Sequence, residues 1–90
     1  MLDIRYAAKF KKDYKAIIKR GYDPQRLQEV LELLCAEQPL PPKYRDHSLS
    51  GNYDGHRECH ILSDWLLIYK IEQNILTLTL TRTGTHSDLF

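Results

Sequence analysis

The first half of the chain changes its hydrophobic period from two residues to about 3.6. Apolar and polar residues alternate over residues 2–6, which predicts a short first strand. An apolar stripe at spacings of three and four residues then predicts an amphipathic helix that ends at Gly21. Asp23-Pro24 predicts the start of a second helix, because Asp is a favourable N-cap and Pro suits the first helical turn. The second helix has its own apolar stripe, formed by Leu27, Val30, Leu31 and Leu34.

After Tyr44 the hydrophobic period returns to two. The turn pairs Gly51-Asn52 and Asp54-Gly55 predict that residues 47–54 are loop, with at most a short extended piece. Strands are predicted over residues 56–62, 65–72 and 75–83. In the last of these, Leu76, Leu78 and Leu80 alternate with threonines, which predicts one buried and one polar side. Gly84 is expected to release the chain into the tail.

The element order βααβββ predicts the fold class. We expect a single α+β domain over residues 1–90, with an antiparallel sheet and a helix hairpin packed on one face. The apolar stripes of the two helices require a single surface to cover. The opposite face of the sheet is therefore expected to be polar and open, and functional residues are expected there.

Composition excludes several classes of protein. Of the 90 residues, 42% are hydrophobic and 28% are charged, which is typical of a soluble globular domain. No apolar run approaches the ~18 residues of a membrane span, and the N-terminus does not resemble a secretory signal. Two cysteines do not suggest a disulfide framework. We therefore expect a cytoplasmic protein that does not associate with a membrane.

The charge is nearly balanced overall but uneven along the chain. The net charge is +1, whereas residues 9–20 contain six basic residues and one acidic residue, a local charge of +5. This segment, with Lys11, Lys12 and Lys15 at its centre, suits attraction to the phosphates of RNA. The alternative interpretation is an ordinary solvated helix face.

Four histidines raise the question of a metal site. On a strand, His56 and His60 lie roughly 13 Å apart at ~3.3 Å per residue, too far to bind one ion at ~2 Å. Cys59 points to the opposite face from His60, and the usual Cys/His spacings of zinc sites are absent. We therefore predict no metal and no other cofactor.

Acid–base chemistry without a metal fits the polar residues better. Histidine exchanges protons near neutral pH, and Asp64 is a carboxylate that could orient a neighbouring imidazole. Arg82 offers a bidentate contact to a phosphate. Trp65 and Phe90 are flat surfaces on which a base could stack.

Each of these residues also has a purely structural interpretation. Trp65 could be a core residue, Phe90 a loose terminus, and His56 a solvated strand residue. Arg82 could pair with a carboxylate such as Glu58 or Asp64. Since Arg82 is in alternation with buried leucines, it must either lie beyond the edge of the core or follow a bulge.

Histidines and an arginine without a metal are suited to cleavage of RNA. One group takes the proton from a ribose 2′-OH, and that oxygen attacks the adjacent phosphorus. A second group protonates the departing 5′-oxygen while the arginine stabilises the charged phosphorane. DNA lacks the internal nucleophile, so this chemistry implies RNA.

Two joined motifs point to a known family. The segments DHSLSGNYDGHRECHILSDWLLIYK and TRTGTHSDLF resemble the pattern D-H-x-L-x-G…R-x-x-H…D-x-x-L-x-Y…R-x-G-[ST]-H-x-x-L-F. This pattern is typical of the YafQ-type toxins of the RelE/ParE toxin superfamily, and the match covers nearly the whole chain. The resemblance implies a RelE-like fold and a bacterial type II toxin, an endoribonuclease that cleaves mRNA on the translating ribosome.

The resemblance also implies partners and roles. The partners are a cognate antitoxin protein of the DinJ or RelB type, the ribosome and mRNA, with operator DNA bound only through the antitoxin complex. His86 is expected to transfer one proton, Arg82 to contact the phosphate, and either His47 or His60 to transfer the other proton. The tail after Gly84 is expected to fold back toward these two histidines. The implied catalytic residues are His47, His60, Asp64, Arg82 and His86, and the implied RNA-binding residues are Trp65, Phe90, Lys11, Lys12 and Lys15.

Two other functions remain open at this point. A ParE-like protein would inhibit DNA gyrase without catalysis, and it would need no cluster of histidines. A ribosome-independent RNase would cleave naked RNA. The family pattern assigns no role to His56.

Overall fold

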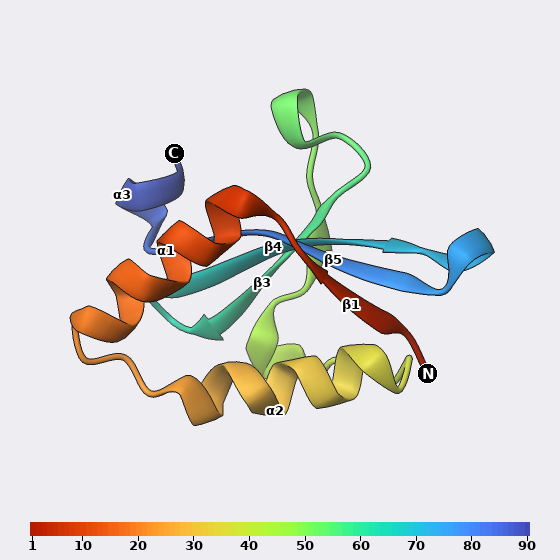
Figure 1. The fold of residues 1–90 in the computed structure, drawn as a ribbon, viewed down its shortest axis with the longest axis horizontal. Helices are drawn as coiled ribbons and strands as arrows, with labels where there is room; N and C mark the ends of the chain where they lie inside the picture. Colours follow the sequence, from red (N-terminus) through yellow and green to blue (C-terminus); the bar gives the residue numbers. More distant parts are fainter.

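The computed structural model describes residues 1–90 and contains one five-stranded sheet with two long helices (Figure 1). The strands are β1 (Asp3–Tyr6), β2 (His47–Ser48), β3 (Arg57–Leu62), β4 (Trp65–Glu72) and β5 (Thr77–Gly84). The helices are α1 (Ala8–Lys19), α2 (Pro24–Cys35) and the short C-terminal α3 (His86–Leu89). Short 3₁₀ turns lie at Pro42–Tyr44, Gly51–Tyr53 and Gln73–Ile75. The predicted α+β class and element order are confirmed, with β2 and α3 as additions.

The sheet is mixed, with the strand order β1-β5-β4-β3-β2. The pairs from β5 to β2 are antiparallel, but β1 runs parallel to β5. The prediction of a wholly antiparallel sheet is therefore wrong at this edge. A parallel pair needs a long crossover connection. Here both helices and three strands lie between β1 and β5, so no local turn sets the direction of β1.

The main core lies between the helices and one face of the sheet. Phe10 and Ile17 of α1, and Val30 of α2, are buried against strand residues such as Leu67 and Leu78. Figure 1 shows α2 on one side of the sheet and the loop between β2 and β3 projecting from the other side. Both helix stripes thus cover one face, as predicted. No helix in the structure has the length and apolarity of a membrane span.

The opposite face of the sheet is partly covered. Leu66 and Ile68 of β4 are buried there beneath Leu89 of α3, with Leu49 and Tyr53 packed against them. The prediction of an open polar face is therefore wrong for this region. A central strand that is covered on both faces has a continuous apolar sequence, and residues 65–69 of β4 are all buried.

The last strand and the tail also differ from prediction. Strand β5 begins at Thr77, because Leu76 adopts a left-handed backbone (φ 48°) and is 52% exposed. After Gly84 the chain forms the short helix α3, an element that was not predicted. The Thr85 and Asp88 side chains each accept a hydrogen bond from the other residue's backbone N–H, a capping box that fixes this helix.

Candidate active site

Four strands bring polar residues into one cross-strand row. His47 on β2 is opposite Glu58 on β3, Glu58 is opposite Ile68 on β4, and Ile68 is opposite Arg82 on β5. Residues in register lie on the same face of a sheet, so all four lie on the face that α1 and α2 leave uncovered. His60, two residues after Glu58 on β3, shares this face. The sheet therefore gathers His47, Glu58, His60 and Arg82 on one side.

Glu58 lies between the two histidines. Its Oε1 atom is 3.3 Å from Nε2 of His47 and 4.0 Å from Nε2 of His60, and the two imidazole rings are 6.5 Å apart. Glu58 is only 6% exposed, and its Oε2 atom is buried without a hydrogen-bond partner. A carboxylate in this place would stabilise positive charge on either imidazole.

The hydrogen bonds of His47 define where a proton lies. Nδ1 of His47 is 2.8 Å from the carbonyl oxygen of Arg45, and a carbonyl only accepts, so Nδ1 donates. Nε2 then faces Oε1 of Glu58 at 3.3 Å. The carboxylate therefore lies where it can stabilise a proton on Nε2 of His47, an arrangement that suits an acid–base group.

The segment before His47 is anchored by its neighbour Asp46. The Arg57 guanidinium and the Tyr69 hydroxyl both donate hydrogen bonds to the Asp46 carboxylate. Burial, followed by the contact with Asp46, raises the pKa of Tyr69 well above its usual range. This network ties β2 to β3 and β4 and so fixes the position of His47.

Arg82 reaches the site through an irregularity in β5. Ile68 is opposite Arg82 and Tyr69 is opposite Leu80, so Thr81 is an extra residue in the ladder. The bulge interrupts the alternation that would otherwise place Arg82 with the core leucines. Of the two alternatives left open by the sequence, the structure therefore shows a bulge.

The guanidinium of Arg82 is paired with Asp13 of α1. Its Nε and Nη2 atoms donate to the Asp13 carboxylate at 2.6 and 3.1 Å, and the side chain of Arg82 is 20% exposed. The hydrogen bonds from Asp13 raise the pKa of Arg82, and the Tyr53 hydroxyl adds a smaller contribution. Neither Glu58 nor Asp64, the partners considered from sequence, accepts a hydrogen bond from Arg82.

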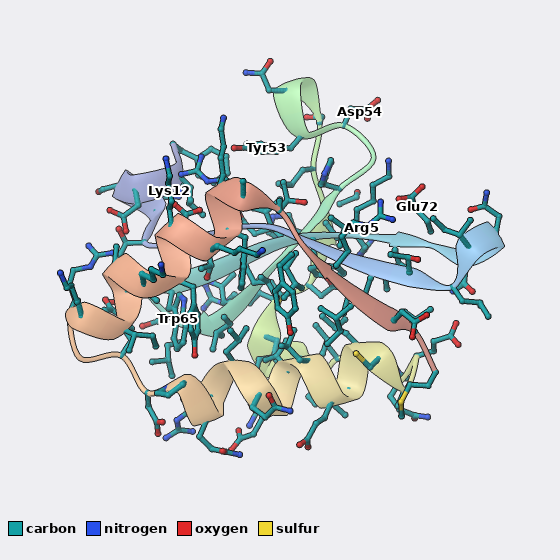
Figure 2. All side chains as sticks on the ribbon, viewed as in Figure 1. Arg5, Lys12, Tyr53, Asp54, Trp65 and Glu72 are labelled. Carbon is teal, nitrogen blue, oxygen red and sulfur yellow. The ribbon has the colours of Figure 1, made fainter.

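Trp65 and Asp64 lie outside the row that contains His47, Glu58 and Arg82. Trp65 is fully buried beneath the helices, and its Nε1 atom donates to Oγ1 of Thr83 at 2.8 Å (Figure 2). No surface remains on which a base could stack, so the predicted RNA-binding role of Trp65 does not fit the structure. Asp64 accepts a hydrogen bond from the Tyr22 hydroxyl at 2.8 Å. The carboxylate beside the histidines is Glu58.

His86 and Phe90 belong to a chain of aromatic rings at the same face. The rings of His86 and Phe90 are 5.1 Å apart, and Phe90 meets Tyr53 at 6.2 Å. Tyr53 extends from the β2–β3 loop toward α3 (Figure 2) and also contacts His56 at 6.0 Å. Phe90 is 57% exposed, so its ring remains available to a ligand. No contact joins His86 directly to His47 or His60.

Comparison with known proteins decides the family. Residues 2–90 match the family model described as "Bacterial toxin of type II toxin-antitoxin system, YafQ". The chain belongs to this family.

Individual YafQ relatives agree with this assignment. The mRNA interferase toxin YafQ of Escherichia coli K12 is 42% identical over 89 residues, which cover 98% of this chain and 95% of that protein. A metal-bound toxin from Helicobacter pylori is 48% identical, with a TM-score of 0.93 over 100% of both chains. A chain of the E. coli DinJ–YafQ complex is 41% identical, with a TM-score of 0.90 over 100% of this chain and 99% of that one. The RelE-like fold that the resemblance implied is thereby confirmed.

The predicted lysines lie on α1 of this YafQ-family toxin. Lys11, Lys12 and Lys15 are exposed. Lys11 and Lys15 also line a groove of about 430 Å³ between α1 and α2, together with Tyr6 and Tyr14. This groove belongs to the helix layer, whereas the histidine row lies on the opposite face of the sheet.

Three residues of the candidate site were not predicted from the sequence. Glu58 had a local signal, because His56, Glu58 and His60 alternate along a predicted strand and must share a face. Tyr53 and Asp13 had no such signal in the neighbouring sequence, because their partners Phe90 and Arg82 lie far away in the chain. No three His, Cys, Asp or Glu side chains converge on a common point where a metal ion would bind.

Proposed function

We propose that this toxin cleaves mRNA on the translating ribosome by metal-independent acid–base chemistry in the bacterial cytoplasm. The enzyme class, an endoribonuclease of the mRNA interferase type, is that of its E. coli relative. The observation that carries the proposal is the row in which Glu58 lies between His47 and His60, with Arg82 on the same face. A protein that only bound DNA gyrase would not need these groups together.

The proposed reaction assigns one step to each group. His47 or His60 removes the proton from a ribose 2′-OH, with Glu58 balancing the charge on the imidazole. The 2′-oxygen then attacks the adjacent phosphorus, and Arg82 stabilises the phosphorane. The bond from phosphorus to the 5′-oxygen breaks, and His86 protonates that oxygen. The products are a 2′,3′-cyclic phosphate and a 5′-hydroxyl.

The aromatic chain supplies a place for the RNA itself. Phe90 is exposed and braced between His86 and Tyr53. Stacking of a base on such a ring contributes ~1–3 kcal/mol and is tolerant of sequence. In this proposal Phe90 holds a base beside the bond that is cut. The exposed lysines of α1 attract ribosomal RNA.

A cognate antitoxin is the proposed protein partner. Solved complexes of a YafQ relative contain DinJ, and this chain covers essentially all of that relative. We therefore propose that a DinJ- or RelB-like protein holds the toxin inactive. Operator DNA would be bound by the complex, through the antitoxin.

The test uses programmed ribosomes and naked mRNA in parallel. We expect cuts only on the ribosome, each leaving a 2′,3′-cyclic phosphate, and no cut where the ribose at the scissile position lacks its 2′-OH. The doubly substituted His47→Gln/His60→Gln protein should be inactive. His56→Gln is the matched control and should remain active. Cleavage of naked RNA at the same rate would favour a ribosome-independent RNase, and inhibition of gyrase without cleavage would favour the ParE-like alternative.

A further inference from the structure

Arg82 lies on β5 beyond the last residue that pairs with β1. Strand β1 pairs with β5 only as far as Leu80, so the edge of β5 is open beyond that residue. Asp13 of α1 occupies this edge. Its Oδ2 atom accepts hydrogen bonds from Nε of Arg82 at 2.6 Å and from the backbone N–H of Thr83 at 3.2 Å, and its Oδ1 atom accepts from Nη2 of Arg82 at 3.1 Å.

These three hydrogen bonds fix the orientation of the planar guanidinium group. Two parallel hydrogen bonds to one carboxylate allow a single orientation of the arginine head group. The third bond ties the same carboxylate to the backbone next to Arg82, so the pair cannot rotate as a unit. Thr83 is itself held, because its Oγ1 atom accepts from Trp65 and donates to the carbonyl of Leu66. The donors of Arg82 that Asp13 leaves free, including both on Nη1, are those that remain for a phosphate.

A purely structural role for Asp13 would be to attach α1 to the sheet. However, α1 already buries Phe10 and Ile17 in the core. The Asp13 side chain is only 16% exposed and directs both oxygens at Arg82. A nearby exposed ion pair, Arg20 with Asp88, also links α1 to the C-terminal segment. Attachment of the helix therefore does not require an acid at position 13.

We propose that Asp13 is a positioning residue for the cleavage reaction, because it orients Arg82 toward the phosphate before RNA binds. This inference rests on the proposed function, in which Arg82 stabilises the phosphorane. A preformed orientation lowers the barrier only if the phosphate reaches the arginine in the transition state. A displacement of about 1 Å at such a group reduces the rate by about 10²-fold.

The decisive experiment is a double-mutant cycle. Single-turnover cleavage on programmed ribosomes is measured for the wild type, Asp13→Asn, Arg82→Ala and the double variant. Asp13→Asn should lower the rate constant about 10- to 100-fold and should leave ribosome binding unchanged. In the Arg82→Ala background the same substitution should have no further effect. Asp3→Asn, an exposed residue of β1, is the matched control and should cleave like the wild type.

Two results would overturn the inference while leaving the proposed function intact. One is wild-type cleavage by Asp13→Asn when Arg82→Ala is inactive. The other is the same loss from Asp13→Asn with and without Arg82, which would mark a structural role. Wild-type cleavage by Arg82→Ala would instead refute the proposed mechanism and, with it, this inference.

A second variant covers the case in which Asp13→Asn does not fold. Asp13→Glu keeps the charge but moves the carboxylate by one methylene. We expect a folded protein with a normal melting temperature and reduced cleavage. Unchanged cleavage by folded Asp13→Glu would contradict the inference.

Discussion

At the scale of single residues, the carboxylates differ in how fully they are paired. Both oxygens of Asp13 accept hydrogen bonds, whereas Oε2 of Glu58 is buried without a partner. An unsatisfied buried polar atom usually costs ~1–3 kcal/mol. A buried unpaired atom at this cost is expected where chemistry requires it, which sets Glu58 apart from the fully paired acids.

Glu58→Gln tests whether Glu58 reduces the stability of the fold but is needed for cleavage. The amide keeps the size and shape of the side chain but removes the buried negative charge. We therefore expect a melting temperature equal to or above that of the wild type, and cleavage reduced by about 10²-fold or more. Thermal unfolding and single-turnover cleavage measure the two effects. A strongly destabilised variant would mean that Glu58 supports the fold instead.

His86→Gln tests the second proton-transfer group. His86 is exposed at the start of α3, so the substitution should change the free energy of unfolding by at most about 0.5 kcal/mol. Removing a positioned acid costs ~10²–10⁴-fold in rate. Cleavage from about pH 5.5 to 8.5, around the unperturbed value for histidine, should lose one limb. Near-normal cleavage by the folded variant would exclude His86 from the mechanism.

At the scale of elements, the contact of α3 with Arg20 is expected to depend on pH through Asp88. The hydrogen bond from Arg20, followed by that from the Thr85 backbone, lowers the pKa of Asp88 to about 2. Because the folded pKa is depressed, the stabilising contribution is complete above the unfolded value of ~3.9 and disappears as the pH falls toward 2. His86 and Phe90 lie on this element and its end, so their positions depend on the same contacts.

Asp88→Asn should therefore loosen α3. We expect a loss of about 0.5–1 kcal/mol of unfolding free energy at neutral pH, since the ion pair is partly exposed. The variant should also lose less stability than the wild type between about pH 4 and 2. Melting curves across this range measure both effects. An identical acid dependence of the two proteins would show that Asp88 does not link α3 to pH.

Helix α1 predicts a separate effect on binding. Replacing Lys11, Lys12 and Lys15 with Glu should weaken ribosome binding in a salt-dependent way, because these lysines are exposed. Binding assays at low and moderate salt measure the change, with the neutral triple Gln variant as an intermediate control. The idea fails if binding is unchanged while single-turnover cleavage collapses.

At the scale of the whole molecule, the proposed chemistry predicts independence from transition metals. Treatment with EDTA, followed by restoration of magnesium for the ribosome, should leave cleavage unchanged. This test is pertinent because one similar toxin is described as metal-bound. If only zinc restored activity to a stripped protein, the acid–base assignment would have to be replaced.

The sequence predicted what depends on local pattern. The periods of α1, α2 and the last three strands follow from side chains that neighbour one another along the chain. The direction of β1 and the partner of Arg82 depend on contacts between residues far apart in the chain, such as Asp13 and Arg82. The burial of Trp65 also required the position of the helices. The family pattern singled out Trp65 and Arg82, and the structure shows that one is buried in the core and the other faces the site.

The extra residue Thr81 exchanges the two faces of the sheet to which alternate residues of β5 point. Before Thr81, Leu78 and Leu80 face the main core. After it, Arg82 lies on the opposite face, in the same cross-strand row as Glu58 and His47. The residues before the bulge thereby serve stability, and Arg82 after it serves the proposed chemistry. Substitutions before the bulge should change unfolding, whereas substitution of Arg82 should change cleavage. Deletion of Thr81 would make Leu80 and Arg82 neighbours on opposite faces of a regular strand, still opposite Tyr69 and Ile68, so a folded toxin with this deletion should keep Arg82 in the row of Glu58 and His47 and should still cleave.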